Sequence, residues 1–293
     1  MAEETKEKDE KDSYAFFDSI KSSMIDYINS IDAGFKKINN ANRLETGFPG
    51  LDFDNGNLIV LASRPGIGKT AFAMSLIKKL AVDKSIPVGF IDTGSMENTA
   101  LAAKLLSITS GLSNGKIKKA LLTLSDFKKI GAAAEQIYSA PVYTAIKPNC
   151  SFDEFVLSAE SMLEEVAVKL IIVEGFDFFR EIIDSEKKFY RFDLENLMDS
   201  FKQFAVKHNI PIVLVMGLPP VETENENEPG IMDFKKKFIV PYKADMVLVL
   251  HREGEKEESE YAYSKLIVAK NVHHITFDIP LKYHPVTCSF EEI

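Results

Sequence analysis

A glycine-rich segment that ends in lysine and threonine has the residue types needed to bind the phosphates of a nucleotide. Residues 63–70 read SRPGIGKT, directly after an apolar run and directly before a helical pattern. Between a strand and a helix, such a loop directs backbone N–H groups and the positive end of the helix toward phosphate oxygens. We therefore expect Lys69 to contact the β- and γ-phosphates of ATP and Thr70 to ligate Mg²⁺. The predicted nucleotide-binding residues are Arg64, Pro65, Gly66, Ile67, Gly68, Lys69, Thr70 and Ala71.

The match to the phosphate-loop pattern is partial. The full pattern places a glycine five residues before Gly68, where this chain has Ser63. The glycines at 66 and 68 still let the loop turn. The alternative, a glycine turn that happens to precede Lys69 and Thr70, is disfavoured because strand, loop and helix follow in the required order.

Alternating apolar runs and helical patterns surround this loop. Runs that are apolar throughout are typical of strands buried on both faces, and strands that alternate with helices indicate a mostly parallel sheet. The predicted strands are 58–62, 88–92, 168–174, 212–216, 246–251 and 265–269, and the predicted helices are 70–82, 99–109, 152–166 and 194–208. We expect an α/β fold with helices on both faces of the sheet and an antiparallel hairpin, 261–270 with 275–280, near the C-terminus.

The composition limits the classes of protein to which the chain can belong. Its 293 residues are 45% hydrophobic and carry a net charge of −9, which excludes a fully disordered chain. A pI near 5.2 argues against binding to nucleic acid by bulk charge. However, residues 1–12, 222–228 and 253–260 carry the whole acidic excess, so the rest of the chain is slightly basic and DNA binding there is not excluded. Two cysteines without ligand spacing favour the reducing cytoplasm, and no apolar run is long enough for a membrane span or a signal peptide.

The N-terminal residues differ in pattern from the rest of the chain. Residues 1–12 are charged throughout and are predicted to be a disordered tail. Residues 13–45 are predicted to be an amphipathic linker helix and a connector, because apolar residues from Phe17 to Ile31 recur at steps of three and four. This helix has two possible partners, its own domain or a neighbouring subunit.

Several motifs together resemble the C-terminal RecA-like ATPase domain of DnaB-type replicative DNA helicases. They are TGFPGLD at 46–52, RP at 64–65, GKTAF at 68–72, LIIVE at 170–174, PIVL at 211–214, ADMV at 244–247 and VAK at 268–270. The resemblance implies a RecA-like domain over 46–293, a ring-shaped homohexamer, ATP bound between subunits and single-stranded DNA in the central channel. It also implies that the linker helix docks on the adjacent subunit, and that replication proteins are partners.

The resemblance fails at three positions of the hydrolytic apparatus. Where the family has a glutamate that activates the attacking water, this chain has Ser95. Gly217 replaces the glutamine that senses the γ-phosphate, and Val272 replaces the arginine finger, which is worth about 10³ to 10⁵ in rate where it has been measured. The catalytic residues therefore remain unknown.

Other residues are weak substitutes for the missing groups. Asp92 and Glu97 are carboxylates near the expected position of the base, and Lys270 could supply a positive charge to a neighbour. Glu174 stands at the Walker B position, where the family has an aspartate, and is predicted to support Mg²⁺ beside Thr70. We expect an ATP-binding helicase-like protein of DNA replication that hydrolyses ATP and unwinds DNA poorly. The alternatives are an active hexameric helicase that translocates on single-stranded DNA, and a non-catalytic interaction module with a vestigial site.

Two basic clusters are candidate DNA contacts. In the family, DNA-binding loops follow the third and fourth core strands, and basic residues interleaved with aromatics suit a stacked single strand. The candidates are Lys187, Lys188, Arg191, Lys235, Lys236 and Lys237. The alternative is that both clusters are ordinary solvated surface.

Overall fold

The computed structural model describes residues 24, 42–94, 96–185, 190–220, 228–252 and 261–293, with the side chains of 184–192 and 236 left out. The chain divides into two units, Met1–Arg43 and Leu44–Ile293. The predicted charged tail and nearly all of the linker segment lie outside the described residues. Met24, within the predicted linker helix, is helical.

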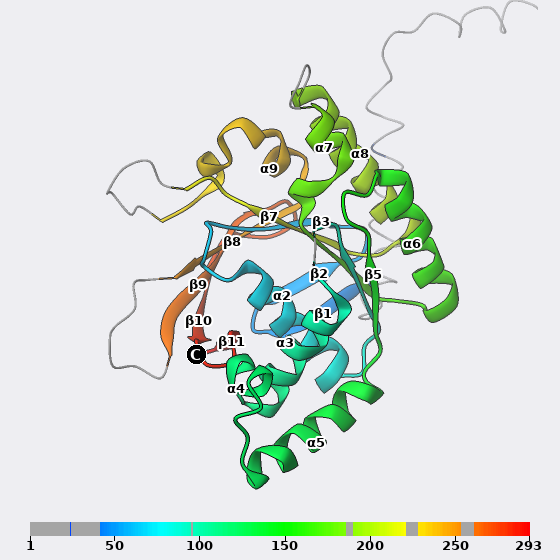
Figure 1. Ribbon diagram of the computed structural model, residues 1–293. Helices are drawn as coiled ribbons and strands as arrows, with labels where there is room; N and C mark the ends of the chain where they lie inside the picture. The colour runs from blue at the N-terminus through cyan, green and yellow to red at the C-terminus, as the bar shows by residue number, and fades with distance from the viewer. Residues whose placement is uncertain (1–23, 25–41, 95, 186–189, 221–227, 253–260) are drawn as a thin grey trace, which may run out of the picture. The chain divides into compact units, whose positions relative to one another are not determined.

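A large mixed sheet forms the centre of the second unit (Figure 1). Within the described residues it has nine strands in the order β11-β10-β9-β8-β3-β7-β6-β4-β5. The strands are β3 (Leu58–Ser63), β4 (Val88–Asp92), β5 (Val142–Ile146), β6 (Leu170–Glu174), β7 (Ile212–Gly217), β8 (Met246–Arg252), β9 (Ala262–Asn271), β10 (Asp278–His284) and β11 (Ser289–Glu292). The strands from β8 to β5 in this order pair in parallel, and β8 to β11 pair antiparallel. The predicted α/β class, mostly parallel sheet and C-terminal antiparallel strands are therefore confirmed.

Helices cover both faces of this sheet (Figure 1). One face carries α2 (Lys69–Ile77), the π-helical turn η1 (Lys78–Asp83), α3 (Asn98–Ser110), α4 (Asn114–Lys118) and α5 (Leu124–Ser139). The other carries α6 (Phe152–Val166), the 3₁₀ turn η2 (Phe176–Phe178), α7 (Arg180–Ser185), α8 (Tyr190–His208), the 3₁₀ segment η3 (Ile231–Lys237) and α9 (Ile239–Lys243). No helix in the described part of the chain is both long and apolar enough to cross a bilayer.

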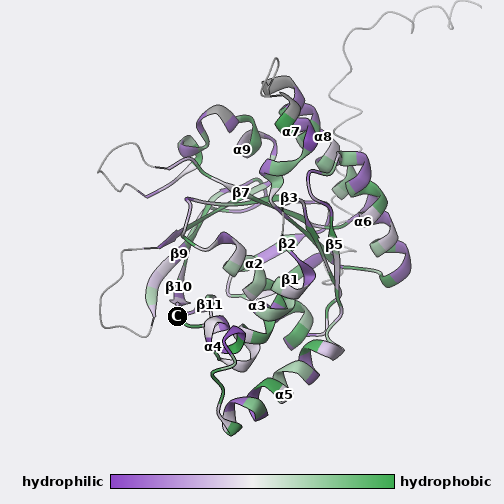
Figure 2. Cartoon of the chain, viewed as in Figure 1, coloured by the Kyte–Doolittle hydropathy of each residue, from purple (hydrophilic) through white to green (hydrophobic). Residues whose placement is uncertain are grey.

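Alternation along the central strands produces two hydrophobic cores. In β3, Leu58 and Val60 pack with α6 and α8, while Ile59 and Leu61 pack with α2 and α3. Figure 2 shows the apolar colouring concentrated on these strands and on the helix faces turned toward them. Because a strand with helices on both sides has no solvent-facing residues, the runs are apolar throughout, as the sequence predicted.

The region between α3 and α6 was not predicted. It contains α4, α5 and β5, whose residues are only partly buried. Helix α5 is amphipathic, so its periodicity was an available signal, but apolar residues such as Leu124 and Phe127 are exposed. The start of α5 also had a sequence signal, since Thr123 and Asp126 are spaced for the reciprocal capping box that they form there.

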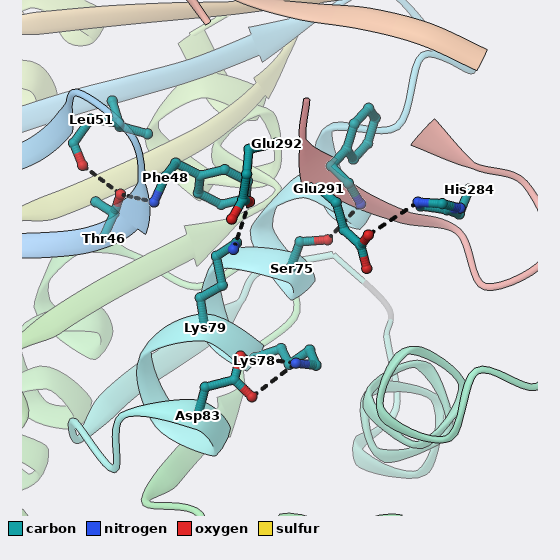
Figure 3. Close-up of polar contacts among 11 residues, drawn as sticks. Thr46, Phe48, Leu51, Ser75, Lys78, Lys79, Asp83, His284, Glu291 and Glu292 are labelled. Carbon is teal, nitrogen blue, oxygen red and sulfur yellow. Dashed lines mark hydrogen bonds and ion pairs between the residues drawn. The ribbon is translucent and has the colours of Figure 1, made fainter. Parts of the chain in front are cut away.

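The first motif of the resemblance folds as a short hairpin of β1 (Arg43–Phe48) and β2 (Leu51–Asp54). The Thr46 hydroxyl donates to the Leu51 carbonyl and accepts the backbone N–H of Phe48 at 3.1 Å (Figure 3). The Phe48 ring stacks on Phe72 of α2, with centroids 4.9 Å apart. The hairpin therefore supports the helix that follows the phosphate loop.

Candidate nucleotide-binding site

The phosphate loop connects the buried strand β3 to α2, as predicted. Gly66 and Gly68 have φ values of +79° and +113°, a left-handed region that favours glycine. Helix α2 begins at Lys69, and its first backbone bond runs from Phe72 N–H to the Gly68 carbonyl at 2.9 Å. The free N–H groups at the start of this nine-residue helix point into the loop, which is the geometry that binds phosphate.

Residues near the C-terminus support the same loop from outside. A Cβ atom on Gly68 would lie 3.1 Å from Cε2 of Phe290, so the ring of Phe290 lies directly against the loop. Strand β11 is fixed to α2 and η1, because the Phe290 N–H donates to the Ser75 hydroxyl of α2 at 2.9 Å and Lys79 of η1 pairs with Glu292 at 2.7 Å (Figure 3). Sequence reasoning missed these contacts, since more than 200 residues separate the partners.

An arginine and a tyrosine stack beside the loop. The Arg252 guanidinium lies 4.4 Å from the centre of the Tyr283 ring, and it also donates to the Gly66 carbonyl at 3.1 Å. A planar cation over an aromatic ring is a favourable platform for another flat group, such as a nucleobase. No local sequence motif marks this pair.

Thr70 and Glu174 meet across the loop. The Thr70 hydroxyl donates to Oε1 of Glu174 at 2.7 Å, while Oε2 is buried and has no hydrogen-bond partner among the described residues. Burial raises the pKa of the Glu174 carboxyl to about 7, with Asp92 adding to the rise and Lys69 and Lys104 opposing it. A buried oxygen without a partner next to a hydroxyl fits a hydrated Mg²⁺, which takes one or two protein oxygens beside phosphate and water. The described residues contain no cluster of three acidic, histidine or cysteine side chains for a larger metal site.

The two candidate bases already have local roles. Asp92 ends β4 in register with Glu174 of β6, is buried, and accepts the Met96 N–H at 2.8 Å. Burial raises the pKa of the Asp92 carboxyl. Glu97 lies just before α3, where its carboxylate accepts the Thr99 hydroxyl at 3.2 Å. Asp92 therefore holds the loop after β4, and Glu97 lies at the surface.

Lys270 is engaged with the end of α9. Its ammonium donates to the carbonyls of Pro241, Tyr242 and Ala244 at 3.0, 2.8 and 2.7 Å. Partial burial lowers the pKa of Lys270. These bonds satisfy carbonyls that a helix leaves free at its C-terminus. To supply its positive charge to a neighbouring subunit, the ammonium would have to break all three hydrogen bonds.

The predicted DNA-contact residues have different environments. Lys187 and Lys188 lie outside the described residues, as do the side chains of Arg191 and Lys236. Lys235, at a φ of +45°, lines an apolar groove of about 520 Å³ with Met232 and Phe238. Lys237 forms an ion pair with Asp177 of η2. A DNA contact therefore stays a prediction for these residues.

Lys104 of α3 affects the electrostatics of Glu174. Its positive charge acts on Glu174 and favours the ionised carboxylate, which lowers the pKa of that group. Sequence reasoning passed over it because a single lysine in an amphipathic helix carries no motif.

These features define a class: a RecA-like P-loop nucleotide-binding domain, with the phosphate loop at the carboxyl end of a central parallel strand and a carboxylate at the end of a nearby one. The chain belongs to the family described as DnaB-like helicase C terminal domain, whose model matches residues 31–292.

Relatives named as replicative helicases match most of the chain. The replicative DNA helicase DnaB of Treponema pallidum (strain Nichols) is 29% identical over 259 residues, which are 86% of this chain and 57% of the relative. A probable plasmid replicative DNA helicase of Chlamydia psittaci is 24% identical over 263 residues, 87% of this chain and 56% of the relative. The chain therefore matches little more than half the length of these relatives.

Solved structures share the fold. One solved ATPase domain has a TM-score of 0.77 at 16% identity, covering 94% of this chain and 99% of that one. A DnaB-like replicative helicase, described with its interactions with primase, has a TM-score of 0.79 at 17% identity, covering 94% and 67%. At these identities the similarity establishes the fold alone.

Proposed function

We propose that this chain binds Mg²⁺ and ATP as a member of the replicative helicase family and hydrolyses ATP poorly. The observation that carries the proposal is the contact between Thr70 and Glu174 above an intact phosphate loop. Lys69 at the start of α2 would contact the β- and γ-phosphates, and the N-terminal N–H groups of α2 would donate to their oxygens. The carboxylate of Glu174 and the hydroxyl of Thr70 would hold a hydrated Mg²⁺, which would neutralise phosphate charge.

The groups needed for fast hydrolysis have other tasks in this chain. Asp92 holds the Met96 backbone, Lys270 holds the end of α9, and Val272 is an exposed apolar residue at the finger position. Moving a catalytic carboxylate by about 1 Å can cost 10²-fold in rate, so substitution from these positions is unfavourable. Binding without efficient hydrolysis follows.

The Arg252 and Tyr283 stack supports recognition of the nucleobase. It lies beside Gly66 of the phosphate loop, and both groups have flat faces against which a base can pack. These two groups would hold the base by packing against it, with the phosphates held by the loop. This arrangement favours a nucleoside triphosphate over free polyphosphate.

Membership of the family supports a proposal for the assembly and partners of the chain. We propose that it joins a ring of like subunits or of a full-length helicase through residues 13–45, and that it contacts single-stranded DNA and other replication proteins. The solved relative described with primase supports a partner of that kind. Size measurement with and without ATP, on the full chain and on a chain lacking residues 13–45, tests the role of the linker.

Titration with a fluorescent ATP analogue tests the binding step. The wild type should bind in a manner that depends on Mg²⁺, and Lys69→Ala should abolish binding. Equal behaviour of the two proteins would contradict the proposal. A steady-state ATPase assay with single-stranded DNA tests the hydrolysis step, because turnover above the ~1 s⁻¹ low end of ordinary enzymes would overturn poor hydrolysis.

A second candidate function, an active helicase, is favoured by one observation. The positive charge of Lys104 lowers the pKa of Glu174, and for an active helicase we propose that this lysine supplies the charge that the missing arginine would supply. The active helicase predicts rapid turnover that Lys104→Met removes. If the protein only binds ATP, turnover should be slow in both the wild type and Lys104→Met.

A further inference from the structure

The end of β7 lies directly beside the start of the phosphate loop. Gly217, its last residue, is in register with Ser63 of β3, and the Leu218 N–H donates to the Ser63 carbonyl at 2.9 Å. A side chain at position 217 would therefore be next to the loop that holds the phosphates. Glycine offers none.

A carboxylate lies against the position that this side chain would take. The Gly217 N–H donates to Oδ2 of Asp177 at 2.8 Å, and a Cβ atom on Gly217 would lie 3.4 Å from the same oxygen. Asp177 follows Glu174 by three residues, in the turn after β6. Its carboxylate thus joins the ends of the two strands that flank the site.

The second oxygen of Asp177 holds a cation. The Lys237 ammonium donates to Oδ1, and both side chains are about three-quarters buried, with 25% and 28% exposure. An ammonium has three donors, and a single carboxylate oxygen uses one of them. Lys237 therefore brings a positive charge with spare donors to the carboxyl ends of β6 and β7.

A second ion pair holds the same segment against the loop. Asp233, four residues before Lys237, pairs with Arg64 of the phosphate loop at 3.4 Å. Between the two pairs, Lys235 has a φ of +45°, so η3 is kinked rather than regular. The segment 231–237 is thus fixed at two points on the rim of the nucleotide site.

We propose that Lys237, positioned by Asp177, makes the contact with the terminal phosphate that residue 217 cannot make, and so distinguishes ATP from ADP. The inference rests on the proposed ATP binding and adds a binding residue and a positioning residue to it. The γ-phosphate adds negative charge at the strand ends, where a partly buried ammonium on a flexible stem is attracted to it. ADP lacks that charge, so the ammonium stays on Asp177.

Competition between ATP and ADP in the full chain tests this inference. Affinities for both nucleotides are measured with Mg²⁺ for the wild type, Lys237→Met and Lys237→Arg. A charge-assisted hydrogen bond is worth roughly 1.5–3 kcal/mol, so Lys237→Met should lower the ATP preference by about 10- to 100-fold. Its ADP affinity should stay within about twofold, and Lys237→Arg should retain most of the preference.

A matched control and a second positioning variant complete the experiment. Lys243→Met removes another paired lysine, which contacts Glu195 and Asp199 of α8, and should leave the preference unchanged. Asp177→Asn keeps the shape but loosens the ammonium, so the preference should fall without loss of folding, as checked by thermal unfolding.

The outcomes separate this inference from the proposed function. If the wild type shows no Lys69-dependent binding, the proposed function fails. If binding is intact but Lys237→Met lowers ATP and ADP affinity equally, or changes only binding to single-stranded DNA, Lys237 is not the discriminating residue. Equal wild-type affinity for ATP and ADP would also overturn the inference.

Discussion

The Thr70 hydroxyl donates to Oε1 of Glu174 across 2.7 Å and joins the phosphate loop to the end of β6. The two residues are 104 positions apart in the sequence, and each ends up at the same edge of the sheet because β3 and β6 both flank β7 in parallel. The Glu174 carboxylate is buried, and its second oxygen, Oε2, has no hydrogen-bond partner within the described residues. Its protonation therefore affects stability.

Stability should fall as pH rises from about 4.5 to about 7 because of Glu174. Burial raises the pKa of this carboxyl from 4.5 to about 7, so in this window the folded state binds a proton that the unfolded state has released. The loss should reach at most about 3 kcal/mol and level off above pH 7. Urea denaturation of nucleotide-free protein at several pH values measures it. Glu174→Gln should flatten this part of the pH dependence, and identical slopes in both proteins would contradict the assignment.

Gly68→Ala should destabilise the protein more than Gly66→Ala. Both positions have positive φ, which costs an alanine roughly 1 kcal/mol. Only at Gly68 would the new Cβ also press on Phe290, at 3.1 Å, while Gly66 has open space around it. Overpacking adds about 1–3 kcal/mol. Chemical denaturation compares the two variants, and Gly68→Ala with Phe290→Leu should recover part of the difference. Equal losses of stability in Gly68→Ala and Gly66→Ala would show that the Phe290 ring moves aside without a measurable cost.

Lys270→Met should lower stability rather than catalysis. The ammonium satisfies three carbonyls at the end of α9, and a methionine would leave them without this donor. We expect a loss of about 1–3 kcal/mol in the free energy of unfolding, with the slow ATP turnover unchanged at a temperature where the variant is folded. Unchanged stability with reduced turnover would instead support a charge supplied to a neighbouring subunit.

Arg252→Ala should weaken ATP binding but not tripolyphosphate binding. The guanidinium stacks on Tyr283, so its loss removes one face of the platform for the base while the phosphate loop keeps its residues. Stacked cation contacts are worth about 0.5–2 kcal/mol, which corresponds to a reduction of about 2- to 30-fold in ATP affinity. Calorimetric titration with both ligands gives the comparison, and Tyr283→Phe serves as the control that keeps the ring. Parallel losses for both ligands would assign Arg252 to support of the Gly66 carbonyl.

Much of the fold was predictable because the central strands are buried on both faces. Their apolar runs and the helical patterns between them predicted β3, β4, β6, β7 and β8 within one or two residues at each end. The elements β5, α4 and α5 were not predicted. β5 and α4 contain no buried residue and so leave no apolar run, whereas α5 has an amphipathic pattern that was overlooked.

The amino-acid sequence by itself determined the phosphate loop, the class of fold and the resemblance to the helicase family, since these depend on residues close together in the chain. Only the tertiary structure brought Phe290 against Gly68, Arg252 onto Tyr283, and Lys237 to Asp177. It also revealed that Lys270 is bound to the end of α9. The physical reason is that sheet order and helix packing, which no local pattern encodes, decide which distant side chains share an edge of the sheet.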